Sequence, residues 1–553
     1  MLVVINERML RSRSCLIAFQ NIVPISLYIS IEIVKTIQAY FISQDLDMYY
    51  RDYDTPCVPK TWNISDDLGQ IEYIFSDKTG TLTQNIMEFQ RCSAHGVVYG
   101  EGVTEAQRGS ATREGKENTM DPEELDEKLA KLKHDMLAKM ERTFKNRYLQ
   151  PGKLTLVSPK LADDLADRNS PQRGHLIAFF RALAVCHSVL ADKPEPRGDS
   201  FHLEYKAESP DEAALVAAAR DVGFPFVGKS RDSIDIEVMG QAERYLPLQM
   251  LEFNSTRKRM SVVVRAPDGS LVLYCKGADS VIYERLCKDH DPVLKEKTRT
   301  DMEMFANSGL RTLCVAYRIL SEEEYFDWSR KYEAATSAVQ NRDQEITQAN
   351  DSIEHSLTIL GATALEDKLQ EGVPEAIETL HNAGIKLWIL TGEPIKFHFI
   401  LLRKNQLLIY DYSGDKLQTA IEIGFSCNLL KNDMELMILS ADSVGETRAK
   451  IEAGLNKIAS VLGPPSFDPR KRGFMPGGKA SFAVVIDGST LTHALTDEVK
   501  PLFLALGTQC ETVVCCRVSP AQKALTVKLV SIVFFIGNFP SISSGVASSH
   551  IKC

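Results

Sequence analysis

Asp77 is the residue in this sequence best suited to covalent chemistry. It opens the run Asp77-Lys78-Thr79-Gly80-Thr81-Leu82-Thr83, directly after Ile71 to Ser76, an apolar run that predicts a short buried strand. A carboxylate at the tip of a strand is held rigidly, and carboxylates act as covalent nucleophiles in enzymes that form aspartyl-phosphates. The lysine that follows offsets the charge of a phosphate, the next threonine adds a hydroxyl, and the glycine lets backbone amides approach phosphate closely. We therefore predict a phosphoryl-acceptor site at Asp77.

Four further motifs follow this run. They are Glu208-Ser209-Pro210-Asp211-Glu212-Ala213-Ala214-Leu215, Phe253-Asn254-Ser255-Thr256-Arg257-Lys258-Arg259-Met260-Ser261, Lys276-Gly277-Ala278-Asp279 and Gly309-Leu310-Arg311-Thr312-Leu313. Each motif alone is weak, but the set occurs in the order typical of one family. The run at Asp77 resembles the phosphorylation signature of P-type ATPases, and the four motifs resemble that family's nucleotide-binding domain.

The chemistry of these motifs suits ATP. Phe253 can stack on adenine, whereas Lys258 and Lys276 supply positive charge, and Arg311 can pair bidentately with phosphate oxygens. Glu212 can accept a hydrogen bond from the adenine amino group or position Lys258. Taken alone, Phe253 is more typical of a core and Lys258 of a solvated face, so only the ordered set favours a site. The resemblance implies an ATP-binding set of Asp77, Lys78, Thr79, Glu212, Phe253, Ser255, Lys258, Lys276, Arg311, Thr391, Gly392, Asp415, Arg517 and Lys523.

From Ile359 onward, apolar runs alternate with helical patterns. Strands are predicted at Ile385 to Leu390, Phe482 to Ile486 and Thr512 to Cys516, and charged residues follow the last two. Such strand ends suit a doubly wound parallel sheet, in which sites form at the carboxyl edge. The resemblance implies an α/β fold with an incomplete phosphorylation domain of the haloacid-dehalogenase type. An α+β nucleotide-binding domain splits that domain, and one transmembrane helix precedes it.

Further residues near the phosphate follow from the same resemblance. Asp367 lies in Ala364 to Leu369, a segment that the family places near the phosphate, and Arg517 to Lys523 resembles the segment that contacts nucleotide and phosphoryl group. The expected cofactors are ATP and Mg²⁺, with the metal held by Asp77 and Thr79. The family's Thr-Gly-Asp-Gly-Ala-Asn-Asp motif, whose aspartates hold Mg²⁺, does not occur in the sequence. Phosphoryl transfer depends on that cation, so we expect weak or absent turnover.

One apolar segment, residues 16–42, bears on membrane insertion. A spanning helix needs about 20 mostly apolar residues. Hydropathy alone leaves this segment borderline, with a signal peptide or a buried soluble helix as alternatives. Pro24-Ile25-Ser26-Leu27 resembles the fourth transmembrane helix of lipid flippases, where proline frees backbone carbonyls at membrane depth. Cation pumps have an acidic residue after that proline, whereas Ile25 stands here.

The flippase resemblance implies specific partners and a location. We expect a phospholipid substrate, with Pro24, Ile25, Ser26 and Leu27 on its pathway, and a small membrane-protein subunit. The expected location is a Golgi, endosomal or plasma membrane, with the catalytic part in the cytosol. A net charge of −10 and a pI near 5.7 argue against nucleic acid as a partner. Twelve cysteines without a CxxC pair in 553 residues do not indicate a disulfide framework.

The motifs also predict the domain organisation. We expect an unmatched N-terminus at 1–15, the transmembrane helix at 16–42, phosphorylation-domain segments at 43–90 and 358–530, the nucleotide-binding domain at 91–357, and an unmatched tail at 531–553. Residues 104–172 form a charged insertion, interpreted as a solvated surface segment with one helix, Glu123 to Tyr148. Removing Glu393 to Gly414 restores Leu-Thr-Gly-Asp-Lys, so this insert is interpreted as a translated intron, or alternatively as a surface loop.

Three functions remain open at this point. The first is an ATP-driven phospholipid translocase that forms an aspartyl-phosphate, present as a fragment that does not complete the transport cycle. The second is an inactive ATP-binding domain. The third is a soluble phosphatase of the haloacid-dehalogenase type that uses Asp77.

Overall fold

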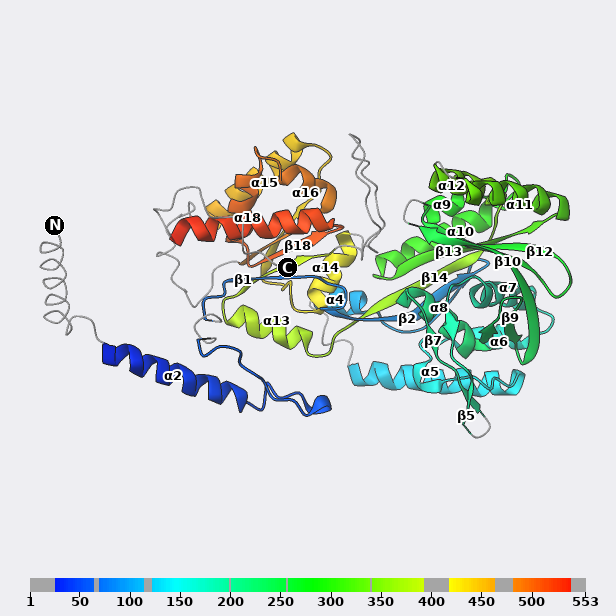
Figure 1. Ribbon diagram of the computed structural model, residues 1–553, viewed down its shortest axis with the longest axis horizontal. Helices are drawn as coiled ribbons and strands as arrows, with labels where there is room; N and C mark the ends of the chain where they lie inside the picture. Colours follow the sequence, from blue (N-terminus) through cyan, green and yellow to red (C-terminus); the bar gives the residue numbers. More distant parts are fainter. Residues whose placement is uncertain are drawn as a thin grey trace, which may run out of the picture. The chain divides into compact units, whose positions relative to one another are not determined.

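The computed structural model describes residues 25–63, 69–113, 122–197, 200–254, 257–338, 341–391, 417–462 and 481–538 (Figure 1). The chain divides into two compact units, Met1–Ile74 and Phe75–Cys553. In the first unit, the described elements are helix α2 (Ile25–Ser43) and a single 3-10 turn, η1 (Arg51–Tyr53).

Helix α2 exposes most of its apolar side chains. Leu27, Tyr28, Ile29, Ile33 and Phe41 are each more than half exposed. Within the described ranges, no helix is both long and apolar enough to cross a membrane. The transmembrane helix predicted over 16–42 is therefore not confirmed, and its residues 16–24 lie outside the described residues.

The smaller sheet of the chain has five strands in the order β1-β15-β18-β17-β16. Neighbouring strands run parallel from β15 through β18 and β17 to β16. The strands predicted near 385–390, 482–486 and 512–516 are confirmed, because apolar runs of this length suit strands buried on both faces. The bounds are β1 (Tyr73–Ser76), β15 (Lys386–Leu390), β16 (Met434–Leu439), β17 (Ser481–Asp487) and β18 (Thr512–Cys516).

Strand β1 differs from its prediction in one respect. Its four residues are half-buried, not buried. The reason is its place at the edge of the sheet, where only β15 pairs with it. Its Phe75 ring still packs edge-on against Trp388 of β15, with ring centroids 5.6 Å apart.

Six helices surround this sheet. Figure 1 shows α15, α16 and α18 on one side of β18 and α13 and α14 on the other, as expected for a doubly wound sheet. Trp388 is fully buried and packs on Phe503. Gly507 allows the Trp388 ring to approach its helix, because a Cβ at position 507 would lie 2.6 Å from that ring. The helices are α13 (Val373–Asn382), α14 (Leu417–Ser426), α15 (Val444–Leu462), α16 (Gly488–Ala494), α17 (Lys500–Gln509) and α18 (Pro520–Asn538).

The larger sheet has nine antiparallel strands in the order β3-β2-β14-β13-β12-β11-β10-β9-β8. The hairpin predicted around Pro267-Asp268-Gly269 is confirmed, since β11 pairs with β12 from Arg265↔Leu271 to Arg259↔Gly277. The strand bounds are β2 (Thr83–Ala94), β3 (Val97–Tyr99), β8 (Phe226–Lys229), β9 (Ile234–Val238), β10 (Gln241–Asn254), β11 (Arg259–Arg265), β12 (Leu271–Gly277), β13 (Arg311–Leu320) and β14 (Thr358–Leu369). Two small ribbons, β4 (Leu190–Ala191) with β7 (Tyr205–Lys206) and β5 (Glu195–Arg197) with β6 (Ser200–His202), flank this sheet.

Each face of the larger sheet covers its own core, because successive side chains of a strand point to opposite faces. Val262 and Val264 of β11 join the core beneath α5–α8, whereas Val263 joins the core beneath α9–α12. The first group of helices is α5 (Pro122–Thr143), α6 (Pro159–Ala166), α7 (Pro171–Val185) and α8 (Pro210–Val222). The second is α9 (Asp279–Tyr283), α10 (Pro292–Asn307), α11 (Glu322–Ser337) and α12 (Arg342–Ile353).

The interpretation of residues 104–172 as a solvated surface segment is wrong for its helices. Met136 and Met140 of α5 and Leu161 and Leu165 of α6 are buried in the core of the larger sheet. The helical spacing of the apolar residues in α5 gives that helix one apolar side, and burial of that side outweighs the charged composition of the rest. The segment is therefore an integral part of this lobe.

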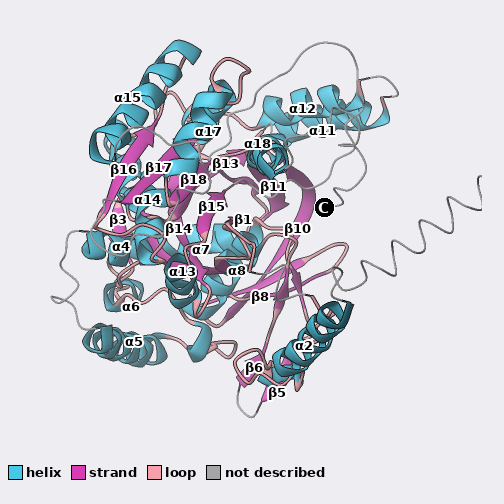
Figure 2. Cartoon of the chain, turned by 90° about the vertical axis from the view of Figure 1, so that its left-hand side faces the viewer, coloured by secondary structure: helices cyan, strands magenta, loops and turns pink. Residues whose placement is uncertain are grey.

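Helix α4 (Glu105–Arg113) packs on α14 (Leu417–Ser426), which lies about 300 residues later in the sequence. Gly109 makes this crossing possible, because a Cβ there would lie 2.0 Å from the carbonyl oxygen of Glu422. Figure 2 shows α4 and α14 next to each other beside β14.

Candidate active site

The carboxylate of Asp77 lies just beyond β1 and is bound from two sides. Its Oδ2 accepts a hydrogen bond from the ammonium of Lys523 over 2.7 Å, and its Oδ1 accepts one from the backbone N–H of Lys78 over 2.8 Å. The Asp77 side chain is 44% exposed and that of Lys523 24%. The carboxylate of Asp77 is thus reachable from solvent, and the ammonium of Lys523 lies beside it.

The turn after Asp77 has the backbone shape that its glycine predicts. Gly80 has φ +75°, and nothing lies near the Cβ that an alanine would add there. The carbonyl of Lys78 accepts from the N–H groups of Leu82 and Thr83 over 2.9 and 3.2 Å. The Lys78 side chain is buried and that of Thr79 is half-buried, so the two residues that follow Asp77 lie in different environments.

Lys523 stands in the first turn of α18, and the neighbouring Gln522 fixes this end of the helix. The Gln522 amide donates to the carbonyl of Gly488 and to the hydroxyl of Thr492, each over 2.7 Å. Both acceptors belong to α16, so the helix that carries Lys523 is braced against its neighbour. In the sequence, the one signal for a role of Gln522 is its position next to Lys523.

The carboxyl ends of β15, β17 and β18 meet at this edge of the sheet. Thr391 donates twice to the carbonyl of Cys515, from its N–H over 2.8 Å and from its hydroxyl over 3.1 Å. Arg517 follows β18 with φ +57°, and its carbonyl approaches Gly488 so closely that a Cβ there would lie 2.1 Å away. Asp487 ends β17 and caps α16 through Thr490 N–H over 2.7 Å. Thr391 and Arg517 are therefore brought to the same sheet edge as Asp77.

The residues at this edge fit a magnesium ion that binds together with nucleotide. Of the predicted metal ligands, Asp77 offers a carboxylate and Thr79 a hydroxyl, and Asp487 at the end of β17 is a second carboxylate at this edge. Mg²⁺ is commonly held by one or two carboxylates plus substrate phosphates and water. In the described part of the chain, no cluster of three or more histidine, cysteine, aspartate or glutamate side chains is arranged to hold a metal by itself.

Glu212 and Lys276 form a buried ion pair in the larger lobe, with 2.8 Å between Oε1 and Nζ. Glu212 lies in the first turn of α8, and Lys276 lies near the end of β12. Ser188 donates to the other carboxylate oxygen through its N–H and its hydroxyl. Burial alone would raise the pKa of Glu212, but the charge of Lys276 and the bonds from Lys276 and Ser188 outweigh it and lower that pKa to about 2. Glu212 thus pairs with Lys276, and Ser188 is a partner that the sequence did not reveal.

Phe253 and Lys258 stand at the ends of β10 and β11, on the same edge of the larger sheet as Lys276. Phe253 is 59% exposed, which is unusual for phenylalanine and leaves its ring free to stack. Asn254 pairs with Arg259, and Arg259 pairs with Gly277, so the second and third motifs are neighbours across the strands.

Arg311, at the start of β13, faces two acids. Its guanidinium lies 3.5 Å from Asp211 of α8 and 3.6 Å from Asp367 of β14. Lys78 and Glu366 line the same small cavity as Arg311 and Asp367; at about 10 Å³ it is the size of about one water molecule. Asp211 of the first motif and Arg311 of the fourth motif are therefore in contact, and Arg311 shares a cavity with Lys78, the residue after Asp77.

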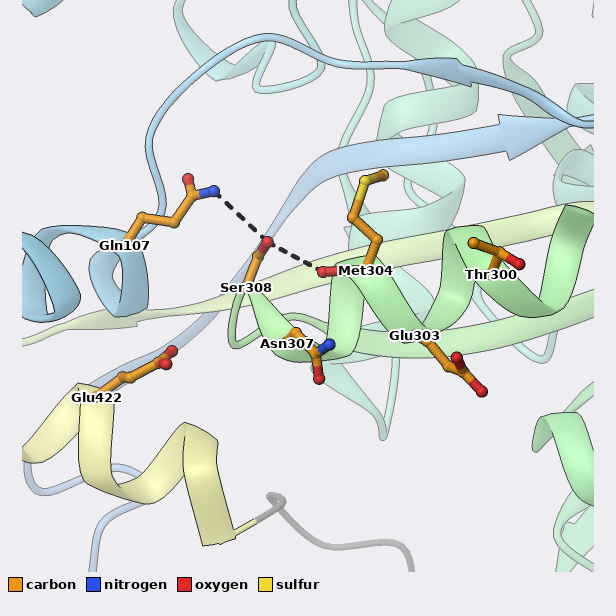
Figure 3. A pocket seen from close by; sticks show the side chains of 7 residues that line it. All are labelled: Gln107, Thr300, Glu303, Met304, Asn307, Ser308 and Glu422. Atoms are coloured by element: carbon orange, nitrogen blue, oxygen red, sulfur yellow. Dashed lines mark hydrogen bonds between the residues drawn. The ribbon is translucent and has the colours of Figure 1, made fainter.

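A larger pocket, of about 440 Å³, lies between α4, α10 and α14 (Figure 3). Its lining residues are Gln107, Thr300, Glu303, Met304, Asn307, Ser308 and Glu422. None of them is a predicted site residue, and the two carboxylates would repel phosphate. This pocket is not where the sequence places nucleotide.

Several predicted positions lie outside the described residues. These are Ser255, Gly392, Asp415 and Pro24, together with the suspected insert 393–414. Ile25, Ser26 and Leu27 open helix α2 in the first unit, and the side chains of Ser26 and Leu27 are exposed.

Comparison with known proteins finds relatives that match most of the chain. A family profile described as "P-type ATPase, cytoplasmic domain N" matches residues 175–372. The chain is 47% identical over 529 residues to "Phospholipid-transporting ATPase DNF1" of Chaetomium thermophilum, which covers 94% of this chain and 32% of that protein. It is 48% identical over 524 residues to "Phospholipid-transporting ATPase dnf2" of Schizosaccharomyces pombe, covering 93% and 35%. The chain is a relative of the phospholipid-transporting P-type ATPases.

This relationship extends beyond fungi. "Phospholipid-transporting ATPase 10" of Arabidopsis thaliana is 40% identical over 529 residues, covering 93% of this chain and 40% of that protein. The family resemblance predicted from the motifs is thus confirmed over almost the whole sequence. The chain spans about a third of the length of these relatives.

Proposed function

We propose that this chain binds ATP in its larger lobe and accepts the terminal phosphoryl group on Asp77. The contact between Lys523 and the Asp77 carboxylate carries this proposal. A carboxylate oxygen attacks the γ-phosphorus, the bond from that phosphorus to the β–γ bridging oxygen breaks, and ADP leaves. An acyl phosphate forms on Asp77, and the ammonium of Lys523 stabilises negative charge on the oxygens in transfer.

The residues of the larger lobe supply nucleotide binding in this proposal. Phe253 stacks on adenine, and Lys258 and Lys276 lie near the phosphates, with Glu212 holding Lys276 in place. Arg311 adds a planar cation between the lobe and the phosphorylation run. Magnesium, held by Asp77, Thr79 and the phosphates, supplies charge neutralisation when it is bound.

We also propose the domain division predicted from the motifs. Residues 43–90 and 358–530 form a phosphorylation domain of the haloacid-dehalogenase type, and residues 91–357 form the nucleotide-binding domain. The parallel five-stranded sheet with Asp77 after an edge strand supports the first part. The family profile over 175–372 supports the second.

By analogy with the phospholipid-transporting relatives, we propose that phosphorylation serves to drive phospholipid across a Golgi, endosomal or plasma membrane, with a small membrane-protein subunit as partner. The printed names of the relatives support the phospholipid. The exposed apolar side chains of α2 support a transmembrane helix over 16–42, with Pro24, Ile25, Ser26 and Leu27 along the lipid pathway.

One observation favours a second candidate, an ATP-binding chain without phosphoryl transfer. In the sequence, the stretch Glu393 to Gly414 separates Gly392 from Asp415, in the segment that follows β15. Incubation with Mg²⁺ and ATP labelled at the γ- or the α-phosphate separates the two candidates. We expect acid-stable label from γ-labelled ATP alone. Saturable nucleotide binding without such label would establish the second candidate instead.

A further inference from the structure

Glu354 lies at the centre of a buried charge cluster in the larger lobe. Its carboxylate is fully buried, directly after the end of α12. It accepts hydrogen bonds from the guanidinium groups of Arg257 and Arg259, the latter over 2.6 Å, and from the hydroxyl of Ser261 over 2.5 Å. Both arginines are also buried, with 3% and 2% of their side chains exposed.

The two arginines flank Lys258, whose backbone is in the left-handed region with φ +50°. L-residues with a side chain rarely adopt this conformation, so the surrounding structure must enforce it. Asn254 anchors the turn on one side, since its carbonyl accepts from Lys258 N–H over 2.8 Å. Ala278 anchors it on the other, because its N–H donates to the carbonyl of Lys258 over 3.1 Å.

Glu354 and Lys276 act on opposite faces of the same strands. Arg259 and Ser261 point to the α12 face of β11, where both donate hydrogen bonds to Glu354. Met260, between them, lies opposite Lys276, whose side chain reaches Glu212 on the α8 face. Glu354 therefore holds the second motif from one face, while the Glu212–Lys276 pair holds the third motif from the other.

Stability alone does not account for such a cluster. Burying three charged groups costs desolvation energy, and well-packed apolar residues are often as stable as a buried ion pair. What charged hydrogen bonds add is direction, because a guanidinium bound at a carboxylate has one orientation. Asp351, three residues before Glu354, accepts a further bond from Arg259 and reinforces that orientation.

We propose that Glu354 is a positioning residue for nucleotide binding. It holds Arg257 and Arg259 in fixed directions and thereby keeps Lys258 in the left-handed turn that presents its ammonium to the phosphates. This inference rests on the proposed binding of ATP by the larger lobe. Glu354 itself contacts neither nucleotide nor Asp77.

The test compares ATP affinity and thermal stability in the full chain. In Glu354→Gln, one N–H₂ group replaces an acceptor oxygen, so one arginine loses its partner. Isothermal titration with ATP is expected to show Kd raised about tenfold, the loss expected of a charged hydrogen bond. The control is Asp221→Asn, which breaks an ion pair to Arg220 that is equally buried in the same lobe. It should lower the thermal midpoint comparably and leave Kd unchanged.

A double-mutant cycle with Lys258→Met separates positioning from general damage. If Glu354 acts through Lys258, adding Glu354→Gln to Lys258→Met should raise Kd no further, so the two effects are not additive. Fully additive effects, or an unchanged Kd in Glu354→Gln, would overturn the inference while ATP binding by the wild-type chain stands. A wild-type chain that binds no ATP would instead overturn the proposed function, and the inference with it.

Should Glu354→Gln fail to fold, Asp351→Asn carries the same test. Asp351 is 44% exposed and shares Arg259 with Glu354, so its loss is tolerated more easily. We expect the Kd for ATP to rise about threefold, because the partly exposed Asp351–Arg259 ion pair contributes less free energy than a fully buried pair. An unchanged Kd in a folded Asp351→Asn chain would contradict the proposal.

Discussion

The ammonium of Lys523 donates a hydrogen bond to Oδ2 of Asp77 across 446 positions of sequence. Asp77 follows the first strand of the smaller sheet, and Lys523 stands at the start of the helix after β18. The sequence between these two residues contains the larger lobe and four of the five strands of the smaller sheet. The fold thus brings the carboxylate of one motif into contact with the ammonium of another.

Replacing Lys523 by methionine tests the role of this cation. The change keeps the length of the side chain but removes the charge next to the transferring phosphoryl group. We expect the rate of acid-stable labelling from γ-labelled ATP to fall about 100-fold, as for loss of one electrostatic donor. Lys528→Met, on an exposed position of the same helix, is the control and should label at the wild-type rate. Equal rates in the two variants would remove Lys523 from the mechanism.

Phe253→Ala tests the adenine contact. The ring is 59% exposed, so its removal should cost little stability, whereas the loss of stacking should raise Kd for ATP about tenfold. Phe326→Ala, on the exposed surface of α11, is matched in exposure at 63% and should leave Kd unchanged. Calorimetric titration of both variants decides the matter; a Phe253→Ala chain with wild-type affinity would place adenine elsewhere.

Glu366 predicts a pH dependence of stability. Burial, more than its neighbours Glu105 and Glu88, raises the pKa of this carboxyl from its usual 4.5 to about 7. The folded state keeps a proton that the unfolded chain releases. The resulting stability is fully present below pH 4.5 and is lost as pH rises to about 7.

Glu366→Gln mimics the protonated form and can still accept the bond from Glu105 N–H. At pH 8 the variant should be more stable than wild type by about 1–3 kcal/mol, and this difference should shrink toward pH 5. Denaturant titrations at several pH values measure it. The control is Glu323→Gln, at an exposed position of α11; its small effect on the free energy of unfolding should be the same at every pH. A Glu366→Gln gain that is constant with pH would contradict the account.

Gly488→Ala tests the close approach behind Asp487. The added Cβ would lie 2.1 Å from the carbonyl oxygen of Arg517, so the ends of β17 and β18 must separate. We expect a loss of about 1–3 kcal/mol in unfolding free energy, together with slower phosphorylation because α16 and α18 shift. Gly445→Ala, in α15 with open space around its Cβ, should instead stabilise the chain by about 0.5 kcal/mol. Similar effects of the two substitutions would argue against the clash.

The sequence predicted four of the five strands of the smaller sheet, because each of them is a short apolar run that ends at a charged or polar residue; strand β16 (Met434–Leu439) was not predicted. It failed on the burial of β1, since edge position depends on strand order and not on the apolar residues of the strand itself. It also failed on the insertion at 104–172. There the charged composition concealed the apolar side of α5, which reaches the core at Met136 and Met140.

The motifs in the sequence identify candidate site residues but not the side chains that contact them. The ordered motifs pointed to Glu212, Lys276 and Arg311, but nothing in the sequence said that Glu212 binds Lys276. Glu354 lies outside every motif, and its two arginines are 95 and 97 positions away. Such contacts depend on the register of β11 against β12 and on the packing of α12, which a single sequence does not contain.

The most direct test of the central claim is the chemical identity of the phosphorylated residue. The full chain is incubated with Mg²⁺ and γ-labelled ATP and quenched in acid. It is then treated with hydroxylamine, or reduced with borohydride, which converts an aspartyl-phosphate to homoserine. We predict label that hydroxylamine removes, homoserine at position 77 by peptide mass spectrometry, and no label in Asp77→Asn. Label that survives hydroxylamine, homoserine at another position, or undiminished label in Asp77→Asn would contradict the assignment of Asp77 as the phosphoryl acceptor.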